Sequence, residues 1–171
     1  MGRNLTPVKN QKESDLVMTP KSLAKTILDY LPLHGKVLEP CRGTGSFYNQ
    51  YDYYDYCEIT EGKDFFAYDE KVDWIVSNPP WSIYREFAQH SYKIADNIAY
   101  LITINHDLAL KARLRDMEAA GFGIKEIILV DAPKTNWPQM GFQLGICWKQ
   151  RGYSGDTKWT RLDWKNELKL L

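Results

Sequence analysis

The chain has 171 residues, 44% of them hydrophobic, which fits one folded domain with a sizeable core and argues against disorder. Its 22 basic and 22 acidic residues cancel, so no bulk attraction to nucleic acid is expected. The sequence has no apolar run of the length that spans a membrane, and no apolar stretch typical of a signal peptide near its start.

The three cysteines stand far apart in the sequence and form no CxxC pair. Cys41, Cys57 and Cys147 therefore predict free thiols in a reducing compartment and no metal site. Together with the missing membrane signals, they favour a cytoplasmic protein.

The first half of the chain predicts one helix and three strands. Residues 1–15 are polar and are expected to be mobile. Thr19 suits an N-cap and Pro20 the first helical position, and the apolar residues that follow fall on one helical face until Pro32 and Gly35. Short strands are then expected at 36–40, 53–59 and 72–78.

The second half predicts two helices and three more strands. Ser82 and Asp107 are expected to cap the helices, the second of which ends at Gly121. Strands are expected at 97–104, 124–130 and 142–148, with the loop 131–141 joining the last two. Residues 150–171 form a polar tail without a clear element.

The alternation of strands and helices predicts an α/β fold with a doubly wound, mostly parallel sheet and a C-terminal antiparallel strand pair. In such sheets ligands bind beyond the carboxyl ends of the strands, where the strand order reverses. The unusual residues of this chain follow two such strands, in the stretches LEPCRGTGS and SNPPW. We therefore expect one site, built from both loops.

The first loop favours a cationic nucleoside. Gly43 and Gly45 allow the backbone to approach a ligand closely, although a G-x-G pattern alone is weak and the phosphate-loop pattern is absent. Glu39 would repel a phosphate. Glu58 ends the next strand, where an acid typically binds ribose hydroxyls, and Asp64 can accept from an adenine amino group. S-adenosylmethionine, with its sulfonium and ammonium groups, fits this set.

The second loop favours a planar amine as substrate. The side-chain carbonyl of Asn78 and the backbone carbonyl of Pro79 are two acceptors that Pro79 and Pro80 hold rigidly. Trp81 is expected to stack on the ring that carries the amine. The alternative is a strand-ending turn with a buried tryptophan.

Together, LEPCRGTGSF and SNPPW resemble the motifs of S-adenosylmethionine-dependent amino-methyltransferases. DLVMTPKSLAKTIL resembles the start of the helix that precedes them in adenine-specific DNA methyltransferases. The resemblance covers residues 15 to about 148 and implies a class I methyltransferase-like fold. Against this family the chain departs in two ways: only fourteen residues separate Glu58 from Asp73, so the usual third strand is expected to be short or absent, and no stretch is long enough for a target-recognition domain.

The resemblance also implies roles for individual residues. Thr19 and Pro20 would lie beside the cofactor carboxylate. Four residues would cradle its methionine part: Glu39, Pro40, Gly43 and Gly45. Glu58 would hold the ribose, and Asp64 and Phe65 the adenine. The catalytic loop would comprise Asn78, Pro79, Pro80 and Trp81, with Asn78 also beside the cofactor.

Two further residues are weaker candidates for substrate binding. His106 follows the strand 97–104 and is expected at the same sheet edge, although a plain loop residue is an alternative. Trp137 is expected either to close over the substrate or to anchor its loop. The stretch 151–165 interleaves basic and aromatic residues, as single-strand binders do, or packs on the core.

These observations predict methyl transfer to the exocyclic amine of adenine in DNA. An RNA base or a protein amide is the alternative substrate, and a catalytically silent subunit that supports a partner is the alternative of another class. Nucleic acid is the expected partner, DNA more than RNA, with a homodimer or a partner subunit supplying what one short domain lacks.

Overall fold

In the computed structural model, residues 15, 17–134, 137 and 141–164 are described. Of the stretch 1–15, expected to be mobile, only Asp15 falls within these ranges. The end of the polar tail, 165–171, lies outside them, as do residues 135–136 and 138–140 of the loop that carries Trp137.

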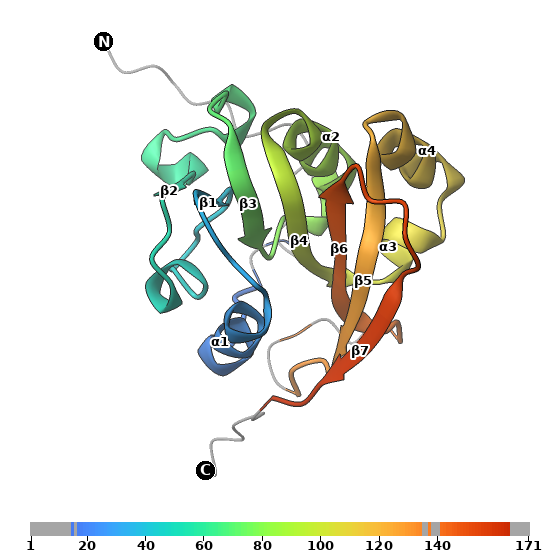
Figure 1. Ribbon diagram of the computed structural model, residues 1–171. Helices are drawn as coiled ribbons and strands as arrows, with labels where there is room; N and C mark the ends of the chain where they lie inside the picture. Colours follow the sequence, from blue (N-terminus) through green and yellow to red (C-terminus); the bar gives the residue numbers. More distant parts are fainter. Residues whose placement is uncertain (1–14, 16, 135–136, 138–140, 165–171) are drawn as a thin grey trace.

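Within the described ranges, seven strands form one sheet in the order β2-β1-β3-β4-β6-β5-β7 (Figure 1). The strands are β1 (Val37–Glu39), β2 (Asp55–Tyr56), β3 (Val72–Ser77), β4 (Ala95–Thr103), β5 (Phe122–Val130), β6 (Leu144–Arg151) and β7 (Lys158–Leu162). Strand β6 runs antiparallel to β4 and β5, and the other neighbouring pairs are parallel. The predicted mixed sheet is thus confirmed.

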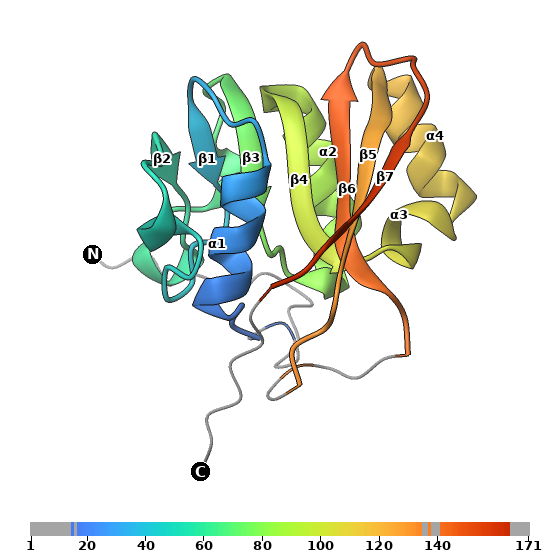
Figure 2. The same ribbon diagram turned by 60° about the horizontal axis from the view of Figure 1, so that its bottom comes forward.

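Helices cover both faces of the sheet (Figures 1 and 2). One face carries α1 (Lys21–Tyr30), and the other carries α2 (Tyr84–Ile94), the short α3 (Asn105–Leu108) and α4 (Lys111–Ala119). Four 3-10 helices complete the described structure, at Tyr48–Gln50, Ile59–Glu61, Phe65–Ala67 and Trp81–Ile83.

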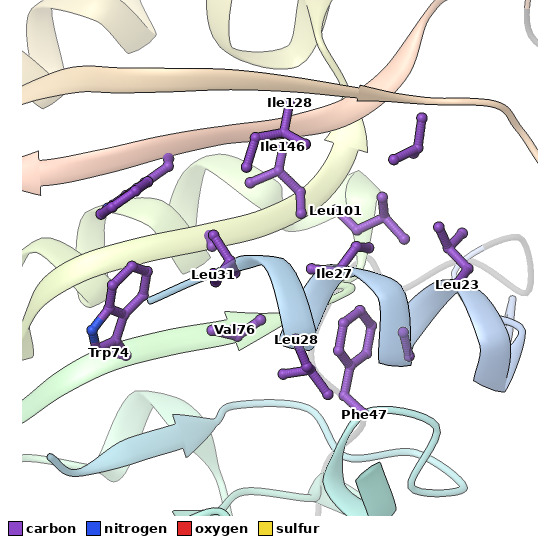
Figure 3. Packing of buried hydrophobic residues seen from close by; sticks show 14 of the residues in the cluster. Leu23, Ile27, Leu28, Leu31, Phe47, Trp74, Val76, Leu101, Ile128 and Ile146 are labelled. Atoms are coloured by element: carbon purple, nitrogen blue, oxygen red, sulfur yellow. The ribbon is translucent and has the colours of Figure 1, made fainter. Parts of the chain in front are cut away.

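The core divides along the sheet because successive strand side chains point to opposite faces. On one face, Leu23 and Ile27 of α1 pack among Val76, Leu101 and Ile146 of the sheet, as Figure 3 shows. On the other face, α2 packs on the alternate strand residues, which include Ile75, Ile98 and Tyr100. These two layers hold β1 and β3 side by side, and the two predicted loops follow these strands.

The three predicted helix caps were wrong. Pro20, not Thr19, occupies the N-cap of α1, and Thr19 is buried. Ser82 lies inside a 3-10 helix that runs directly into α2, and its backbone N–H donates to Asp15 at 3.1 Å. Asp107 lies inside α3, where other buried polar groups bind its carboxylate.

The predicted strand 53–59 contracts to Asp55–Tyr56. At its start the buried Tyr53 donates through its hydroxyl to the Val76 carbonyl at 3.0 Å, and at its end Glu58 caps the 3-10 helix Ile59–Glu61. Residues 57–71, all of them described, contain two 3-10 helices and no strand of the sheet. The third strand that the resemblance implied is therefore absent from this stretch, in line with the short spacing between Glu58 and Asp73. Strand β2 forms the edge of the sheet instead.

Part of the polar tail is a strand, which the sequence did not predict. Strand β7 pairs in parallel with β5, and Thr160 of β7 donates to the buried Glu126 of β5 at 2.5 Å. The hydroxyl of Tyr30 in α1 donates to the same carboxylate. The tail therefore belongs to the folded domain at least as far as Leu162.

In the part of the chain that the structure describes, every helix is too short or too polar to cross a bilayer.

Candidate active site

A pocket opens at the carboxyl ends of β1, β2 and β3, between the glycine loop and the Asn-Pro-Pro loop. Most of the predicted cofactor residues line it: Thr19, Glu39, Pro40, Gly43, Glu58, Asp64, Phe65 and Asn78. Pro80 also lines the pocket, whereas Pro20, Gly45, Pro79 and Trp81 do not. Two stretches that lie about 35 residues apart in the sequence thus form one site, because the hydrogen-bonded strands β1 and β3 end together.

Glu39 is the most unusual group in this pocket. Its side chain is 1% exposed, and Oε1 accepts a hydrogen bond from the Ser77 hydroxyl at 3.2 Å. The other oxygen, Oε2, is buried without a hydrogen-bond partner among the described residues. Burial raises the pKa of Glu39 to about 8, against the opposing effect of the Ser77 hydrogen bond. A cation beside Oε2 would relieve the cost of ionising this carboxyl.

Glu58 joins β2 to the glycine loop. Its Oε2 accepts from the backbone N–H of Gly43 at 2.7 Å, and its Oε1 accepts from the Thr60 hydroxyl at 2.7 Å. Burial alone would raise the pKa of Glu58, but the hydrogen bonds from Thr60 and Gly43 outweigh it and lower the pKa. The carboxylate is therefore charged at neutral pH and keeps lone pairs for further donors such as ribose hydroxyls.

The glycine loop is shaped by two left-handed residues. Gly43 and Gly45 have φ values of 52° and 85°, which residues with a Cβ rarely adopt. A Cβ at Gly45 would also meet the Asn49 side chain at 2.6 Å. The loop leads into the 3-10 helix Tyr48–Gln50 rather than into an α-helix, because the aromatic-rich stretch that follows is a poor helix former.

Asp64 and Phe65 form the far wall of the pocket. Asp64 is exposed, and its Oδ1 accepts from the backbone N–H of Phe66 at 2.9 Å, which caps the 3-10 helix Phe65–Ala67. Phe65 is buried and its ring centroid lies 4.9 Å from that of Phe87 in α2. The missing third strand has not removed these residues from the pocket, since the 3-10 helices return them to it.

Asn78 follows β3 directly and is half-buried at the pocket wall. Its Nδ2 donates to the Val17 carbonyl at 3.2 Å, and its Oδ1 accepts from the Trp81 indole at 3.1 Å. The amide oxygen retains a second lone pair for another donor. Pro79 and Pro80 are buried behind it and restrict the backbone of the loop.

The three predicted substrate residues lie together beside this loop. The ring of Trp81 lies 5.5 Å from that of His106 and 5.9 Å from that of Trp137, between centroids. His106 Nδ1 also forms a hydrogen bond with the Thr103 hydroxyl at 2.6 Å, in which the tautomer of the ring decides the donor. The pKa of His106 is lowered mainly by burial and further by the positive charge of the nearby Arg113. The ring is therefore neutral at neutral pH.

Sequence reasoning missed a segment that crosses the site from the N-terminal side. Val17 and Met18 line the pocket next to Thr19, and the carboxylate of Asp15 binds the hydroxyl of Ser82. The only signal in the sequence is the stretch DLVMTP, from which Thr19 and Pro20 alone are predicted at the site. Val17, Met18 and Thr19 thus line the pocket, and Asp15 contacts the 3-10 helix that follows the Asn-Pro-Pro loop.

A buried ionic network behind the aromatic cluster was also missed. Lys149 of β6 is 1% exposed, and its Nζ donates to Asp107 Oδ2 at 2.7 Å and to the Tyr84 hydroxyl at 2.6 Å. Burial alone would lower the pKa of Lys149, but the charge of Asp107 outweighs it and raises the pKa. This network fixes α3, which carries His106.

Among the described residues, no three His, Cys, Asp or Glu side chains gather as metal ligands would. The thiol of Cys41 is near the pocket and its Sγ lies 3.3 Å from the Asn78 carbonyl oxygen, to which it donates. Burial raises the pKa of Cys41, so this thiol is protonated at neutral pH.

No family model and no curated protein matches the chain. Solved structures do match. A candidate class I S-adenosylmethionine-dependent methyltransferase of Listeria monocytogenes aligns with 90% of this chain and 68% of its own, at 12% identity and a TM-score of 0.66. A candidate RNA methyltransferase of Pyrococcus horikoshii aligns with 90% of this chain and 94% of its own, at 14% identity and a TM-score of 0.56.

The M protein of the type I restriction enzyme EcoKI aligns with 90% of this chain at 13% identity and a TM-score of 0.60. The alignment spans only 49% of that protein. At such low identities these likenesses establish the fold alone. The chain has the fold of class I methyltransferases, as its motifs predicted.

Proposed function

We propose that the chain transfers a methyl group from S-adenosylmethionine to the exocyclic amine of adenine in DNA. The observation that carries this proposal is the convergence of two features at one sheet edge: a pocket with the buried, half-satisfied carboxyl of Glu39, and the Asn78 loop at the wall of the same pocket. Neither feature alone specifies methyl transfer. Their juxtaposition on this fold supports it.

The pocket residues fit the cofactor on their own chemistry. Among the described residues the buried Glu39 Oε2 has no hydrogen-bond partner, and it suits an ammonium or sulfonium group. Glu58 is anchored by Gly43 and Thr60 and suits ribose hydroxyls, while Phe65 and Asp64 suit an adenine ring and its amino group. When bound, S-adenosylmethionine supplies an electrophilic methyl carbon on a positively charged sulfur.

The chain would catalyse transfer by orienting the target amine toward the methyl carbon of the cofactor. Asn78 Oδ1 and the Pro79 carbonyl would accept the two amine hydrogens, so that the nitrogen lone pair faces the methyl carbon. The amine nitrogen would form its new bond to the methyl carbon as the carbon–sulfur bond breaks, and the methylated amine would then lose one proton to water. Trp81, His106 and Trp137 form an apolar and aromatic wall suited to a base that has left its stack.

RNA is the second candidate substrate. The P. horikoshii protein, a candidate RNA methyltransferase, aligns over 94% of its own length, whereas the alignment covers 49% of the EcoKI M protein. A protein amide remains the third candidate from the motif resemblance. We propose that the substrate, whichever of the three it is, is bound in the cytoplasm. A second copy of this chain or another subunit would complete its recognition.

One experiment separates these possibilities. The purified chain is incubated with methyl-labelled S-adenosylmethionine and matched single-stranded DNA, duplex DNA, RNA and protein, and the labelled products are hydrolysed and identified. We expect N6-methyladenine from DNA, and none from Asn78→Ala. Labelled RNA or protein would replace the DNA assignment by the corresponding alternative. Cofactor binding without transfer to any substrate would favour the silent subunit, and calorimetry without binding would reject the cofactor.

A further inference from the structure

The indole N–H of Trp81 points at Asn78 rather than at solvent. Trp81 begins the 3-10 helix Trp81–Ile83 and is half-buried. Its Nε1 lies 3.1 Å from Asn78 Oδ1 and 3.2 Å from the carbonyl oxygen of Leu101 in β4. One donor is therefore shared between the catalytic loop and the neighbouring strand.

The opposite end of the Asn78 amide is held as well. Its Nδ2 donates to the backbone carbonyl of Val17 at 3.2 Å. An indole nitrogen can only donate and a backbone carbonyl can only accept. Only one of the two orientations of the amide satisfies both neighbours. The flipped orientation would set two donors against each other at Trp81 and two acceptors against each other at Val17.

The ring of Trp81 is itself fixed. Its centroid lies 5.5 Å from His106 and 5.9 Å from Trp137, and its side chain packs against both hydrophobic core clusters. The backbone of Asn78 is fixed separately, because the Cys41 thiol donates to its carbonyl oxygen at 3.3 Å. The Trp81 ring and the Asn78 backbone are thus both held in place. The hydrogen bond from the indole N–H then determines the orientation of the Asn78 side-chain amide.

We propose that Trp81 is a positioning residue whose indole N–H fixes the amide of Asn78 with Oδ1 available to the target amine. This inference rests on the proposed function. It assigns Trp81 a role that stacking does not require, because a phenylalanine in its place would offer an aromatic face but no donor. The orientation it imposes leaves the second lone pair of Oδ1 as the acceptor for the substrate.

The kinetic test removes the N–H and keeps the ring. L-3-benzothienylalanine, incorporated at position 81 by codon reassignment, replaces the indole N–H by sulfur with almost the same shape. We expect kcat to fall about five- to tenfold, the loss of one hydrogen bond, while the cofactor Kd and the substrate KM stay within about twofold. The same replacement at Trp74, a core tryptophan whose Nε1 has no hydrogen-bond partner among the described residues, should leave kcat unchanged. Unchanged kcat at position 81 would overturn the proposal and leave Trp81 a stacking residue.

A second measurement does not depend on activity. In a ¹⁵N–¹H spectrum, the indole signal of Trp81 is identified by its loss in Trp81→Phe. We expect Asn78→Ala to move this signal upfield and to speed its exchange with solvent, and His90→Gln, away from this contact, to leave it in place. A signal that Asn78→Ala does not move would overturn the proposal, whatever the kinetics. If the wild-type chain methylates nothing, the proposed function fails, and the spectrum alone decides whether Trp81 holds the amide.

Discussion

Glu58 Oε2 accepts a hydrogen bond from the backbone N–H of Gly43 at 2.7 Å, and this contact ties the end of β2 to the glycine loop. The carboxylate therefore has two tasks in the proposed site: it shapes the loop and it faces the ribose. Substitution of Glu58 should therefore weaken cofactor binding in two ways, by loosening the glycine loop and by removing the ribose contact. The Thr60 hydroxyl, which donates to the other oxygen, fixes the side chain for these tasks.

Glu58→Ala should weaken S-adenosylmethionine binding by about 1–3 kcal/mol, because hydrogen bonds to a charged group are lost. Thr60→Val keeps the Gly43 contact and should cost less, about 0.5–1.5 kcal/mol. Calorimetry measures both. Glu118→Ala, an exposed change on α4, is the control and should bind like wild type. Equal affinity for Glu58→Ala and the control would remove Glu58 from the cofactor site.

Glu39 should make cofactor binding depend on pH. Because burial raises its pKa to about 8, the carboxyl is protonated in the free protein at pH 6 and must ionise to bind a cation well. Affinity should therefore rise between pH 6 and pH 8, by up to about tenfold per pH unit, with release of a proton on binding. Calorimetry in buffers of different ionisation enthalpy measures that proton.

Glu39→Gln is the matched variant, since it keeps the shape and cannot ionise. Its affinity should be lower at pH 8 and independent of pH from 6 to 8. The folding stability of the free protein changes with pH in the opposite direction to the cofactor affinity. A carboxyl with a raised folded pKa contributes stability that is present below its ordinary pKa and is lost as pH rises through about 8. Free wild-type protein should thus lose stability relative to Glu39→Gln over that window. A parallel pH dependence in the two proteins would contradict this account.

Asn78→Ala should remove activity while leaving cofactor affinity nearly intact. The side chain is assigned to the target amine, and loss of one preorganised polar group lowers kcat by about 10²–10³. Because Nδ2 also binds the Val17 carbonyl, the variant loosens the segment beside the pocket, and cofactor Kd should rise by no more than about threefold. Single-turnover rates with labelled cofactor measure the methyl-transfer step. Wild-type turnover on a confirmed substrate would make the assigned role wrong.

The sequence predicted the elements and loops that depend on local chemistry. Gly43 and Gly45 mark a loop with positive φ, and Pro79 and Pro80 mark the end of a buried strand. Both signals lie within a few residues, and the parallel sheet then brings the two loops to one edge. This is why most of the predicted cofactor residues line the pocket.

The contacts that were missed join distant parts of the chain. Lys149 and Asp107 are 42 residues apart, and the Asn78 amide binds a carbonyl 61 residues upstream. Neither pairing follows from local patterns, because each needs the tertiary packing of a loop or short helix against a strand end or a strand far away in the sequence. The caps failed for the same reason: Asp107 and Ser82 suit an N-cap locally, but tertiary partners bind their oxygens.

The Lys149–Asp107 pair should be costly to break and cheaper to remove. Lys149→Met leaves the Asp107 carboxylate buried without its cation and should lower the free energy of unfolding by about 3–5 kcal/mol. The double variant with Asp107→Asn removes both charges and should recover part of that loss. Urea titration measures all three proteins. Additive losses in the double variant would mean that the two side chains do not act as a pair.

Strand β7 carries part of the basic and aromatic tail and forms the edge of the sheet opposite β2. It runs parallel to β5, so its carboxyl end lies at the same edge as the carboxyl ends of β1 and β3. Its side chains alternate between the two faces. Thr160 and the exposed Lys158 contact Glu126, whereas Trp159 and Arg161 lie on the other face and are exposed as well. Deleting the tail from Arg151 onward would remove a strand of the sheet and would not isolate nucleic-acid binding.

Point substitutions in β7 are therefore the sharper test of the tail. Trp159, 60% exposed, offers a stacking face. Arg161, which pairs with the exposed Asp131, offers a cation that a phosphate could bind. Trp159→Ala with Arg161→Gln should raise the KM for nucleic acid about three- to tenfold and reduce the salt slope of binding by about one. Lys25→Gln, which removes an exposed charge on α1, is the control for net charge. Circular dichroism should show both variants folded, and an unchanged salt slope in the β7 variant would place the nucleic acid elsewhere on the domain.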